Sequence, residues 1–509
     1  MKSRYLLVCA VCGMLMPMHL AAEENINYDA SLTVETSSGS FAPYYFAANR
    51  WGTLTQSDNV LLNVGASRDY DLSKRVTWSY GVRAVGGRTS ATSYDVFHAS
   101  SDPQWDIRYA RPAAIWLQEA WAGFKFRGVY IEGGMRQSGS PLLDDELSSG
   151  DMVHSANARP VPQIMAGFID FQNIPFTNKW AQIKGVISYG WFVQNKWLED
   201  HYNFYNYHIT RNQLYSYKNI YFRSNPEKPF SVTVGAQIAG DFGGTTYHYS
   251  NGKLYSVEQH GSSISDYWKM LIPTPDNGDD FYEGALLGSW DFQARYRLRS
   301  GYELKAYFQW LWEDGSGMSK HNGWDGLWGV EYKSDNPWWI DGAVIEYLDL
   351  TNHSGPIHYA PHFQGADIPY QSTGADNYYN SGYYNAYTNL GMGMGNAMVM
   401  SPIYNRDGYP QFLLNRVKGV HVALRGTLSD NVTYKVKFGW RKALGTSYEP
   451  LQAPVHSTML MAEASWRIPQ VKGLQLTGAF GLDHGEMPGN SVGGMVTISY
   501  DGLLKLNGK

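Results

Sequence analysis

One segment of the chain has the residue types of a metal site. HSGPIHYAPHF, at residues 353–363, contains His353, His358 and His362, and imidazole nitrogens are common zinc ligands. The histidine spacing matches neither the i, i+4 pattern of a helical site nor a Cys/His framework. Two prolines also break the segment. We therefore expect an ordinary loop here and no bound metal.

Carboxylates and glycines gather at three further places. PDNGDD places Asp276, Asp279 and Asp280 around a glycine, but without the full spacing of a calcium loop, so a plain turn is favoured. Asp144, Asp145 and Glu146 are adjacent, whereas a glycosidase needs two carboxyls facing each other across a cleft. GMGMGN at 391–396 lacks the strand-then-helix context of a nucleotide-binding loop. We expect no catalytic residues and no cofactor, and therefore no enzyme.

The elements that must position any functional residue have the residue pattern of long amphipathic strands. In KWAQIKGVISYGWFV, residues 179–193, an apolar register from Ala181 to Val193 alternates with a mostly polar one that includes Gln182, Lys184 and Ser188. Similar alternation occurs at 230–242, 288–298, 302–312 and 431–442. About ten residues of period-two alternation, with aromatics near the ends, is typical of a tilted membrane-spanning strand. We expect the apolar register to face lipid and the polar register to face a lumen, where a lysine at Ser188 would be tolerated.

The connections between these strands alternate between short and long. Short ones include 127–128, 225–229 and 429–431, and long ones include 138–160, 242–285 and 351–415. Outer-membrane barrels have short periplasmic turns and long outer loops. The sequence therefore predicts an all-β fold, a transmembrane antiparallel β-barrel of about 18 strands (16–18), with a short N-terminal plug and long extracellular loops. A large soluble β-protein is the structural alternative.

The N-terminus has the pattern of an exported protein. Two basic residues precede an apolar stretch and then small residues in MKSRYLLVCAVCGMLMPMHLAA, which predicts a signal peptide at 1–22. We assign 23–59 to an N-terminal strand and plug segment, and 60–509 to the barrel. The formal net charge of −5 is too small to indicate a nucleic-acid partner. The expected location is the cell outer membrane.

Two sets of residues are candidates for ligand binding. Basic residues in the polar register would form a cationic lumen wall that attracts anions, namely Lys184, Arg295, Arg297, Arg425, Lys435, Lys437 and Arg441. Pairing with nearby carboxylates is the alternative for these residues. The 351–415 loop carries tyrosines whose rings could stack on sugars in an outer cap, namely Tyr370, Tyr378, Tyr379, Tyr383, Tyr384 and Tyr387. A purely structural aromatic loop is the alternative there.

Three stretches resemble the capsule-assembly Wzi family. They are LQEAWAGFKFRGVYIEGGMRQ at 117–137, the run from Leu147 to Phe192 that contains SSG, NARPVPQ and IPFT, and SYKNIYFR at 216–223. The resemblance implies an outer-membrane barrel of about 18 strands, plugged rather than open. It also implies a lectin that holds nascent capsular polysaccharide on the cell surface, and it does not imply an enzyme. The family's best-known members carry a helical periplasmic plug, for which only 41–59 is available here.

The expected function is therefore lectin-like attachment or assembly of capsular polysaccharide. The expected partners are capsular or other surface polysaccharide, outer-membrane lipid and lipopolysaccharide, with the protein as a monomer. The alternative is an outer-membrane porin or uptake channel for small anionic solutes or oligosaccharides. The two functions differ in the state of the lumen, since inward folding of 41–59 and 138–160 would occlude a pore.

Overall fold

The main feature of the molecule is one antiparallel sheet closed into a barrel. The computed structural model describes residues 24–98, 104–272, 284–313, 315–318, 320–353 and 376–506. The barrel has 18 strand positions, which confirms the predicted fold class. Its strands are β1 (Glu24–Phe41), β2 (Gln56–Arg68), β3 (Val76–Thr89), β6 (Ile115–Phe126), β7 (Val129–Met135), β8 (Gln163–Phe168), β9 (Gln172–Asn173), β10 (Ala181–Trp191), β12 (Leu214–Ser224), β13 (Phe230–Phe242), β16 (Ala285–Arg297), β17 (Tyr302–Trp312), β18 (Gly326–Ser334), β19 (Gly342–Asp349), β22 (Val417–Ser429), β23 (Val432–Gly445), β24 (Pro450–Arg467), β25 (Leu474–Gly485) and β26 (Ser491–Leu506).

Barrel strands that follow one another in the chain pair with one another in the wall. β8 and β9 both pair with β10, so they share one strand position. β1 pairs with β2 on one side and with the last strand, β26, on the other. The seam between β1 and β26 runs from Glu24 opposite Leu506 to Ser37 opposite Gly493. This pairing leaves the wall without an open edge, as a membrane-spanning sheet requires.

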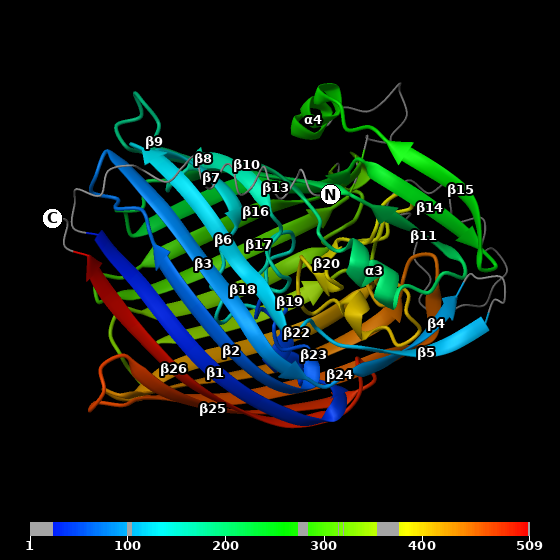
Figure 1. The fold of residues 1–509 in the computed structure, drawn as a ribbon. Coiled ribbons are helices and arrows are strands. Elements are labelled where there is room, and N and C mark those ends of the chain that lie inside the picture. The colour runs from blue at the N-terminus through cyan, green and yellow to red at the C-terminus, as the bar shows by residue number, and fades with distance from the viewer. Residues whose placement is uncertain are drawn as a thin grey trace.

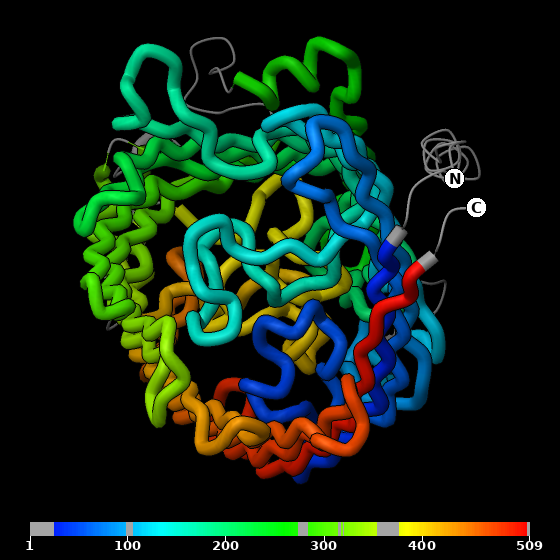
Figure 2. Tube along the Cα trace, turned by 90° about the vertical axis from the view of Figure 1, so that its left-hand side faces the viewer, coloured from blue at the N-terminus to red at the C-terminus, as the bar shows by residue number. Residues whose placement is uncertain are grey.

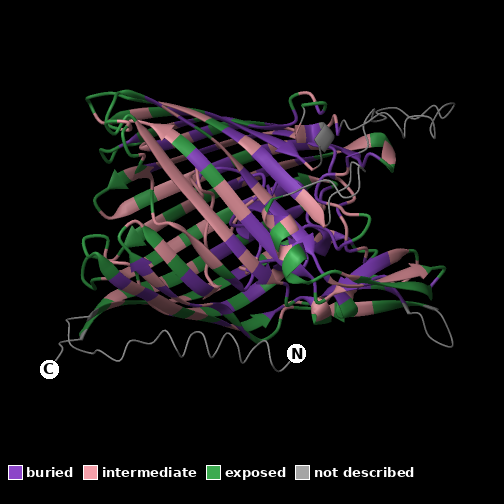
Figure 3. Cartoon of the chain, turned by 90° about the horizontal axis from the view of Figure 1, so that it is seen from above, coloured by how far each residue is buried: buried purple, intermediate pink, exposed green. Residues whose placement is uncertain are grey.

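The burial of side chains along each strand is the inverse of that in a soluble β-protein. On β13, Ser231, Thr233 and Gln237 are buried, whereas Phe230 and Val234 are exposed. The same alternation runs along strands around the barrel (Figure 3). Polar residues therefore face the inside and apolar residues face outward, which is the arrangement expected of a barrel surrounded by lipid.

Aromatic side chains on the outer face gather near both ends of the wall. At one end, Phe308 stacks on Trp328 with ring centroids 3.8 Å apart, and Trp310 stacks on Trp324 at 5.2 Å. At the other end, Tyr302 and Tyr332 stack at 6.1 Å. Girdles of aromatic residues mark the two membrane–water interfaces of such barrels.

The two ends of the barrel differ in the length of their connections (Figure 1). The start of β1, the end of β26 and the short turns, such as 127–128 and 430–431, lie at one end, which is therefore the periplasmic end. The long connections lie at the outer end. They carry α2 (Tyr44–Ala47), β4 (Thr92–His98), β5 (Gln104–Ala110), α3 (Asn195–His201), β11 (Tyr207–Arg211), β14 (Gly244–Ser250), β15 (Lys253–His260), α4 (Ile264–Leu271), α5 (Gly315–Met318), β20 (Thr388–Asn389), β21 (Met392–Gly393) and the 3₁₀ helix η2 (Pro402–Tyr404).

None of the helices in the described part of the chain is long and apolar enough to span a bilayer. Residues 1–22, the predicted signal peptide, lie outside the described residues. β1 lies within 23–59, the segment assigned above to an N-terminal strand and plug, and the chain then turns into the barrel through α2.

Candidate functional site

Three of the outer connections fold back into the lumen. They are residues 42–55, 136–162 and 376–416, and the view along the barrel axis in Figure 2 shows all three inside the ring of strands. We call them the plug segments. Residues 42–55 and 136–162 begin and end at the outer end of the wall, because they join strand ends on that side, and 376–416 leads into the outer end of β22.

The plug segments and the inner wall share one apolar core. Phe46, Met152 and Met398 are buried in the same cluster as the wall residues Tyr215 and Leu311. The cluster includes side chains from all three segments and from most of the circumference of the barrel. Interiors of this kind are packed about as densely as organic crystals. The outer half of the lumen is therefore filled by protein.

Buried polar groups fix the central segment, 136–162, to the wall. The Asp151 carboxylate accepts hydrogen bonds from Gln237 Nε2 at 2.9 Å and from Gln309 Nε2 at 2.7 Å. Gln309 Oε1 in turn accepts from the Met152 backbone N–H at 3.1 Å. Moving the segment would break this network and leave buried polar groups unsatisfied. The network therefore holds the segment in a single position.

The tyrosines of the 376–416 segment belong to this core. Tyr378, Tyr379 and Tyr387 are buried, and the hydroxyls of Tyr379 and Tyr387 donate to the backbone oxygens of Met152 (2.7 Å) and Val153 (3.0 Å). Stacking on a sugar requires an accessible ring face, so the expectation of an exposed tyrosine cap is wrong for these three. The physical reason is that a Tyr ring fills core volume while its hydroxyl finds a buried acceptor.

The remaining tyrosines of the expected cap have different surroundings. Tyr384 is buried, and its backbone oxygen accepts a hydrogen bond from His208 Nε2 on β11 at 2.7 Å. Tyr383 is 55% exposed at the outer surface. Tyr370 lies outside the described residues, as do His358, His362 and the Asp276–Asp280 turn.

His353 is a buried structural residue near the outer end of the plug. Its Nδ1 lies 2.8 Å from Ser447 Oγ, and its backbone N–H donates to Asp325 at 2.8 Å. The same carboxylate accepts a hydrogen bond from the Tyr378 hydroxyl at 3.1 Å. Burial lowers the pKa of His353 to about 3 and raises the pKa of Asp325 to about 7. In the described part of the chain, no group of three or more His, Cys, Asp or Glu residues could hold a metal ion.

Most of the candidate cationic residues are paired with carboxylates or backbone oxygens. Arg425 meets Glu146 at 2.9 Å, Lys435 meets Glu463 at 3.4 Å and Arg295 meets Glu303 at 3.6 Å. Arg297 pairs with Asp335 at the periplasmic rim. Arg441 is buried and donates to the backbone oxygens of Met398 and Met487. Such pairs cancel most of the field that an anion would feel.

Lys184 and Lys437 differ from the rest of this set, since neither ammonium group forms an ion pair or a hydrogen bond within the described residues. Lys437 is buried, and its Nζ lies 5.8 Å from the centre of the Tyr45 ring. Lys184 is only partly buried and lines a cavity, with Nζ 5.9 Å from the centre of the Phe171 ring. Of the candidate cations in the described lumen, Lys184 is thus the one that is both unpaired and reachable.

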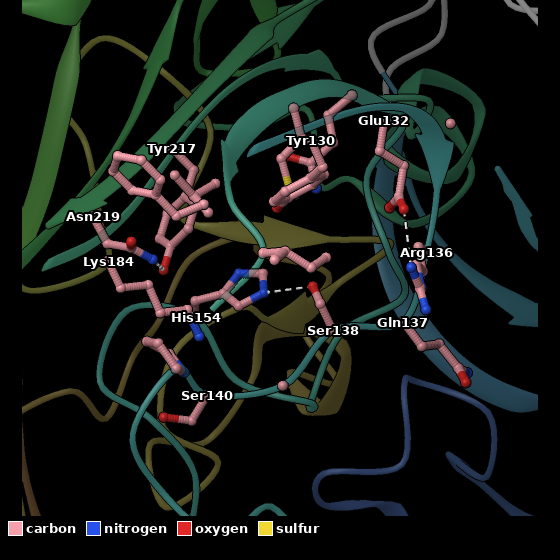
Figure 4. Close-up of a pocket in the computed structure, with 18 of the residues that line it drawn as sticks. Tyr130, Glu132, Arg136, Gln137, Ser138, Ser140, His154, Lys184, Tyr217 and Asn219 are labelled. Carbon is pink, nitrogen blue, oxygen red and sulfur yellow. Dashed lines mark hydrogen bonds and ion pairs between the residues drawn. The ribbon is translucent and has the colours of Figure 1, made fainter. Parts of the chain in front are cut away.

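The cavity beside Lys184 lies between the 136–162 segment and the wall, and Figure 4 shows the side chains around it. Its volume is about 380 Å³, within the range of about 300–1,000 Å³ typical of ligand pockets. Tyr70 and Ile169, from connections at the periplasmic end, form part of its lining, so the cavity faces the periplasm. Other lining residues are Tyr130, Glu132, Arg136, Gln137, Ser138, Ser140, His154, Gln163, Phe168, Tyr217 and Asn219.

The lining combines aromatic rings with hydrogen-bonding groups and one cation that forms no ion pair within the described residues. Arg136 is neutralised by Glu132 at 2.9 Å and by Asp69 at 2.6 Å, which leaves Lys184 as the unpaired cation. His154 Nε2 lies 2.9 Å from Ser138 Oγ, and burial lowers the pKa of His154, so its imidazole is neutral near pH 7. Aromatic faces, amides and one cation suit a polyhydroxylated ligand that carries a carboxylate.

The cavity narrows toward the middle of the barrel. A second space of only about 30 Å³ adjoins it and shares Arg136, Ser138 and His154, while Trp51 and Met394 of the plug line its far side. Another periplasm-facing cavity, of about 550 Å³, lies across the lumen and is lined by Arg425, Lys435, Arg467, Thr477 and Thr497, among others. The cations of this second cavity are mostly paired, as described above.

The three stretches that resemble the Wzi family meet at the 380 Å³ cavity. Tyr130, Glu132 and Arg136 come from 117–137, His154, Gln163 and Lys184 from 147–192, and Tyr217 and Asn219 from 216–223. Of these residues, sequence reasoning selected only Lys184. The signal that could have found the others, apart from His154 of the plug, is the shared lumen register of the neighbouring strands β7, β8, β10 and β12.

Comparisons with known proteins found likeness at the level of structure. No protein-family description and no curated protein matches the sequence. Wzi of Escherichia coli, described as an outer membrane protein involved in group 1 capsule assembly and as a carbohydrate-binding β-barrel, aligns with a TM-score of 0.57 and 12% identity. That alignment covers 93% of this chain and 83% of Wzi.

Two outer-membrane proteins of another kind align less well. OccAB2 of Acinetobacter baumannii has a TM-score of 0.47 at 9% identity over 94% of this chain and 98% of its own. OprD of Pseudomonas aeruginosa has a TM-score of 0.43 at 8% identity over 95% of this chain and 96% of its own. The inverted burial of the strands and the likeness in fold to Wzi identify the chain as an outer-membrane β-barrel.

Proposed function

We propose that the chain is a non-conducting barrel that binds polysaccharide and attaches or assembles it at the cell surface. The filled lumen carries this proposal. A porin needs a continuous aqueous path, whereas side chains from all three plug segments pack against the inner wall here. The likeness to Wzi, which is described as a carbohydrate-binding barrel, supports the class of ligand.

The 380 Å³ cavity is the contact that we assign to an acidic sugar. Its lining offers the aromatic ring of Tyr130, the amide of Gln137 and the ammonium of Lys184 (Figure 4). A carboxylate placed near Lys184 would gain a charge-assisted hydrogen bond, the stronger class of such bonds. Binding is the whole of the proposed role, with no catalytic step and with the protein acting as a monomer.

A gated uptake channel for small anionic solutes is the second candidate. The observation that favours it is the pair of polar cavities at the periplasmic end, about 380 and 550 Å³ in volume. For these cavities to belong to a transport path, the plug segments would have to leave the lumen, which breaks the shared core and the hydrogen bonds of Asp151.

Two measurements on the full-length protein separate the candidates. In planar bilayers we expect no steady single-channel current. In proteoliposomes we expect oligogalacturonate, an acidic saccharide, to bind more tightly than neutral dextran of matched length. Steady large currents would sink the proposal and favour the channel. A silent protein that binds neither saccharide would leave the occlusion intact and contradict the ligand class.

A further inference from the structure

Helix α4 lies against the outside of the barrel, on a surface that the rest of the wall presents to lipid (Figure 1). Met270 of α4 is buried in a cluster with Leu214 of β12 and Phe242 of β13. Both wall residues alternate with inward-facing neighbours such as Tyr215 and Asp241, so they point outward. They sit at the outer ends of their strands, which places α4 at the level of the outer membrane–water interface.

The wall has a notch that accepts this helix. The outward-facing row that joins Tyr189, Ser216, Gly240 and Leu286 across four strands has its two small residues in the middle. A Cβ atom on Gly240 would lie 2.5 Å from Met270 Cε and 2.7 Å from Leu286 Cδ2, so a larger residue here would require these side chains to shift. Ser216 is buried, although it faces outward. The wall is therefore shaped to hold α4.

Polar contacts at the notch fix the helix further. The Tyr189 hydroxyl donates to the Tyr267 backbone oxygen at 2.6 Å, and the two rings lie 5.1 Å apart. Lys218, an outward-facing lysine on β12, donates to the Met270 backbone oxygen near the C-terminal end of α4. A cation there is stabilised by the free carbonyls of the helix end. The N-terminal end has a capping box formed by Ser263 and Asp266.

The docked helix leaves an apolar flank uncovered. Ile264 is 90% exposed and Trp268 is 63% exposed, and Ile272, just after the helix, is 52% exposed. At about 100° per residue, Ile264 and Trp268 lie on one flank, whereas Ser265 and Lys269 lie on the other. Such a division is the signature of a helix lying in a membrane interface, where tryptophan is enriched.

We propose that α4 is an interfacial anchor whose Ile264–Trp268 flank is buried in the acyl region of the outer leaflet. The occupant of this surface is lipid, because the flank continues the lipid-facing wall at the level of the outer aromatic girdle. The anchor would hold the connection between β13 and β16, including β14 and β15, at the membrane surface. This proposal stands independently of whether the lumen binds polysaccharide.

The test compares the two flanks of α4 in the full-length barrel. Cysteine replaces Trp268 or Ser265, in a chain whose only natural cysteines are Cys9 and Cys12 of the predicted signal peptide, and is labelled with a small fluorophore in phosphatidylcholine vesicles. We expect a quencher attached to the lipid acyl chain to quench the Trp268→Cys label several-fold more than the Ser265→Cys label. Aqueous iodide should show the reverse order.

A second variant keeps the result tied to docking. Gly240→Leu fills the notch, so in this background lipid quenching at position 268 should fall and iodide quenching should rise, with the barrel still folded. Equal quenching of the two labels, or stronger iodide quenching at 268 in the unmodified background, would overturn the proposal. Lipid quenching at 268 that is unchanged by Gly240→Leu would overturn the role of the notch.

Discussion

The outer and periplasmic halves of the lumen have the same wall and opposite contents. In the outer half, side chains such as Leu311 and Val417 point inward and pack against the plug segments. In the periplasmic half, lumen-facing residues such as Lys184 and Thr497 line cavities of about 380 and 550 Å³. The barrel is thus closed by its own outer connections and remains accessible to a ligand from the periplasmic side.

The largest expected effect comes from removing the contents of the outer half. A variant in which short Gly–Ser linkers replace both 141–158 and 377–413 should show steady single-channel currents, because 42–55 is then the one plug segment left intact within the described residues. Each single replacement should conduct weakly or intermittently, since the other segment keeps much of the shared core. A double variant that folds, as judged by circular dichroism, and conducts no current in planar bilayers would contradict the closure of the outer half by these two segments.

A lysine placed in the lumen register should distinguish the filled half from the open one. Ser188 is 1% exposed, so Ser188→Lys buries an unpaired charge and should lower the free energy of unfolding by roughly 3–5 kcal/mol. Thr497 lines the 550 Å³ cavity, so Thr497→Lys should cost less than about 1 kcal/mol. Urea unfolding in detergent measures both values. Equal costs would mean that the two halves are equally packed or equally wet.

The two periplasm-facing cavities should differ in their use of a lysine. Lys184→Gln removes the unpaired cation of the smaller cavity and should weaken oligogalacturonate binding about 10-fold, which corresponds to about 1.4 kcal/mol. Lys435→Gln is the matched control, because Lys435 already pairs with Glu463 at 3.4 Å, and it should change the affinity less than threefold. The reverse order, measured by titration calorimetry, would move the site to the larger cavity.

The smallest expected effect is the response of the outer half to pH. His353 has a lowered pKa of about 3, so it destabilises the folded plug as pH falls below the value of about 6.5 for an unfolded histidine. Asp325 has a raised pKa of about 7, so the stability gained by its protonation is lost as pH rises from about 4 through 7. The two contributions to stability change with pH in opposite directions, so the stability of the wild-type plug should change little across this range.

Single variants should separate the pH dependence due to His353 from that due to Asp325. With Asp325→Asn, the plug should loosen as pH falls from 7 to 4, because the buried His353 then acts alone. With His353→Gln, it should tighten over the same interval. Proteolysis of the 376–416 segment as a function of pH reports both trends. Identical profiles for the two variants would show that neither group controls the packing of the outer half.

The architecture was predictable because each wall residue faces either lipid or the lumen. Neighbours such as Phe230 and Ser231 face opposite sides, so the period-two pattern can be recognised within a single strand. Loop parity gave the orientation in the same way, since turn residues report on their own connection. The strand count and the long outer connections follow from these local signals.

The site was predictable only in part, because burial in the lumen depends on distant segments. Tyr378 and Tyr379 read as loop tyrosines, yet Met152, more than two hundred positions away, covers them. Ser188 reads as lumen-facing, and nothing near it in sequence reveals that the lumen is filled there. Arg425 is neutralised by Asp144 and Glu146, which are likewise far away in the chain. Lys184 was selected by register, but its lack of a partner required the structure.

The seam between β1 and β26 has a consequence for how the molecule forms. Thr33 and Thr497 hydrogen-bond across it, 464 positions apart. Contacts of such high sequence separation carry a large loop-closure entropy and form slowly. The barrel cannot close until the last strand has been synthesised and delivered. Residues 42–55, which directly follow β1, become enclosed when β1 and β26 pair. Assembly kinetics should therefore depend on the final strand, and a chain truncated before Ser491 should accumulate as an unclosed sheet open to proteases.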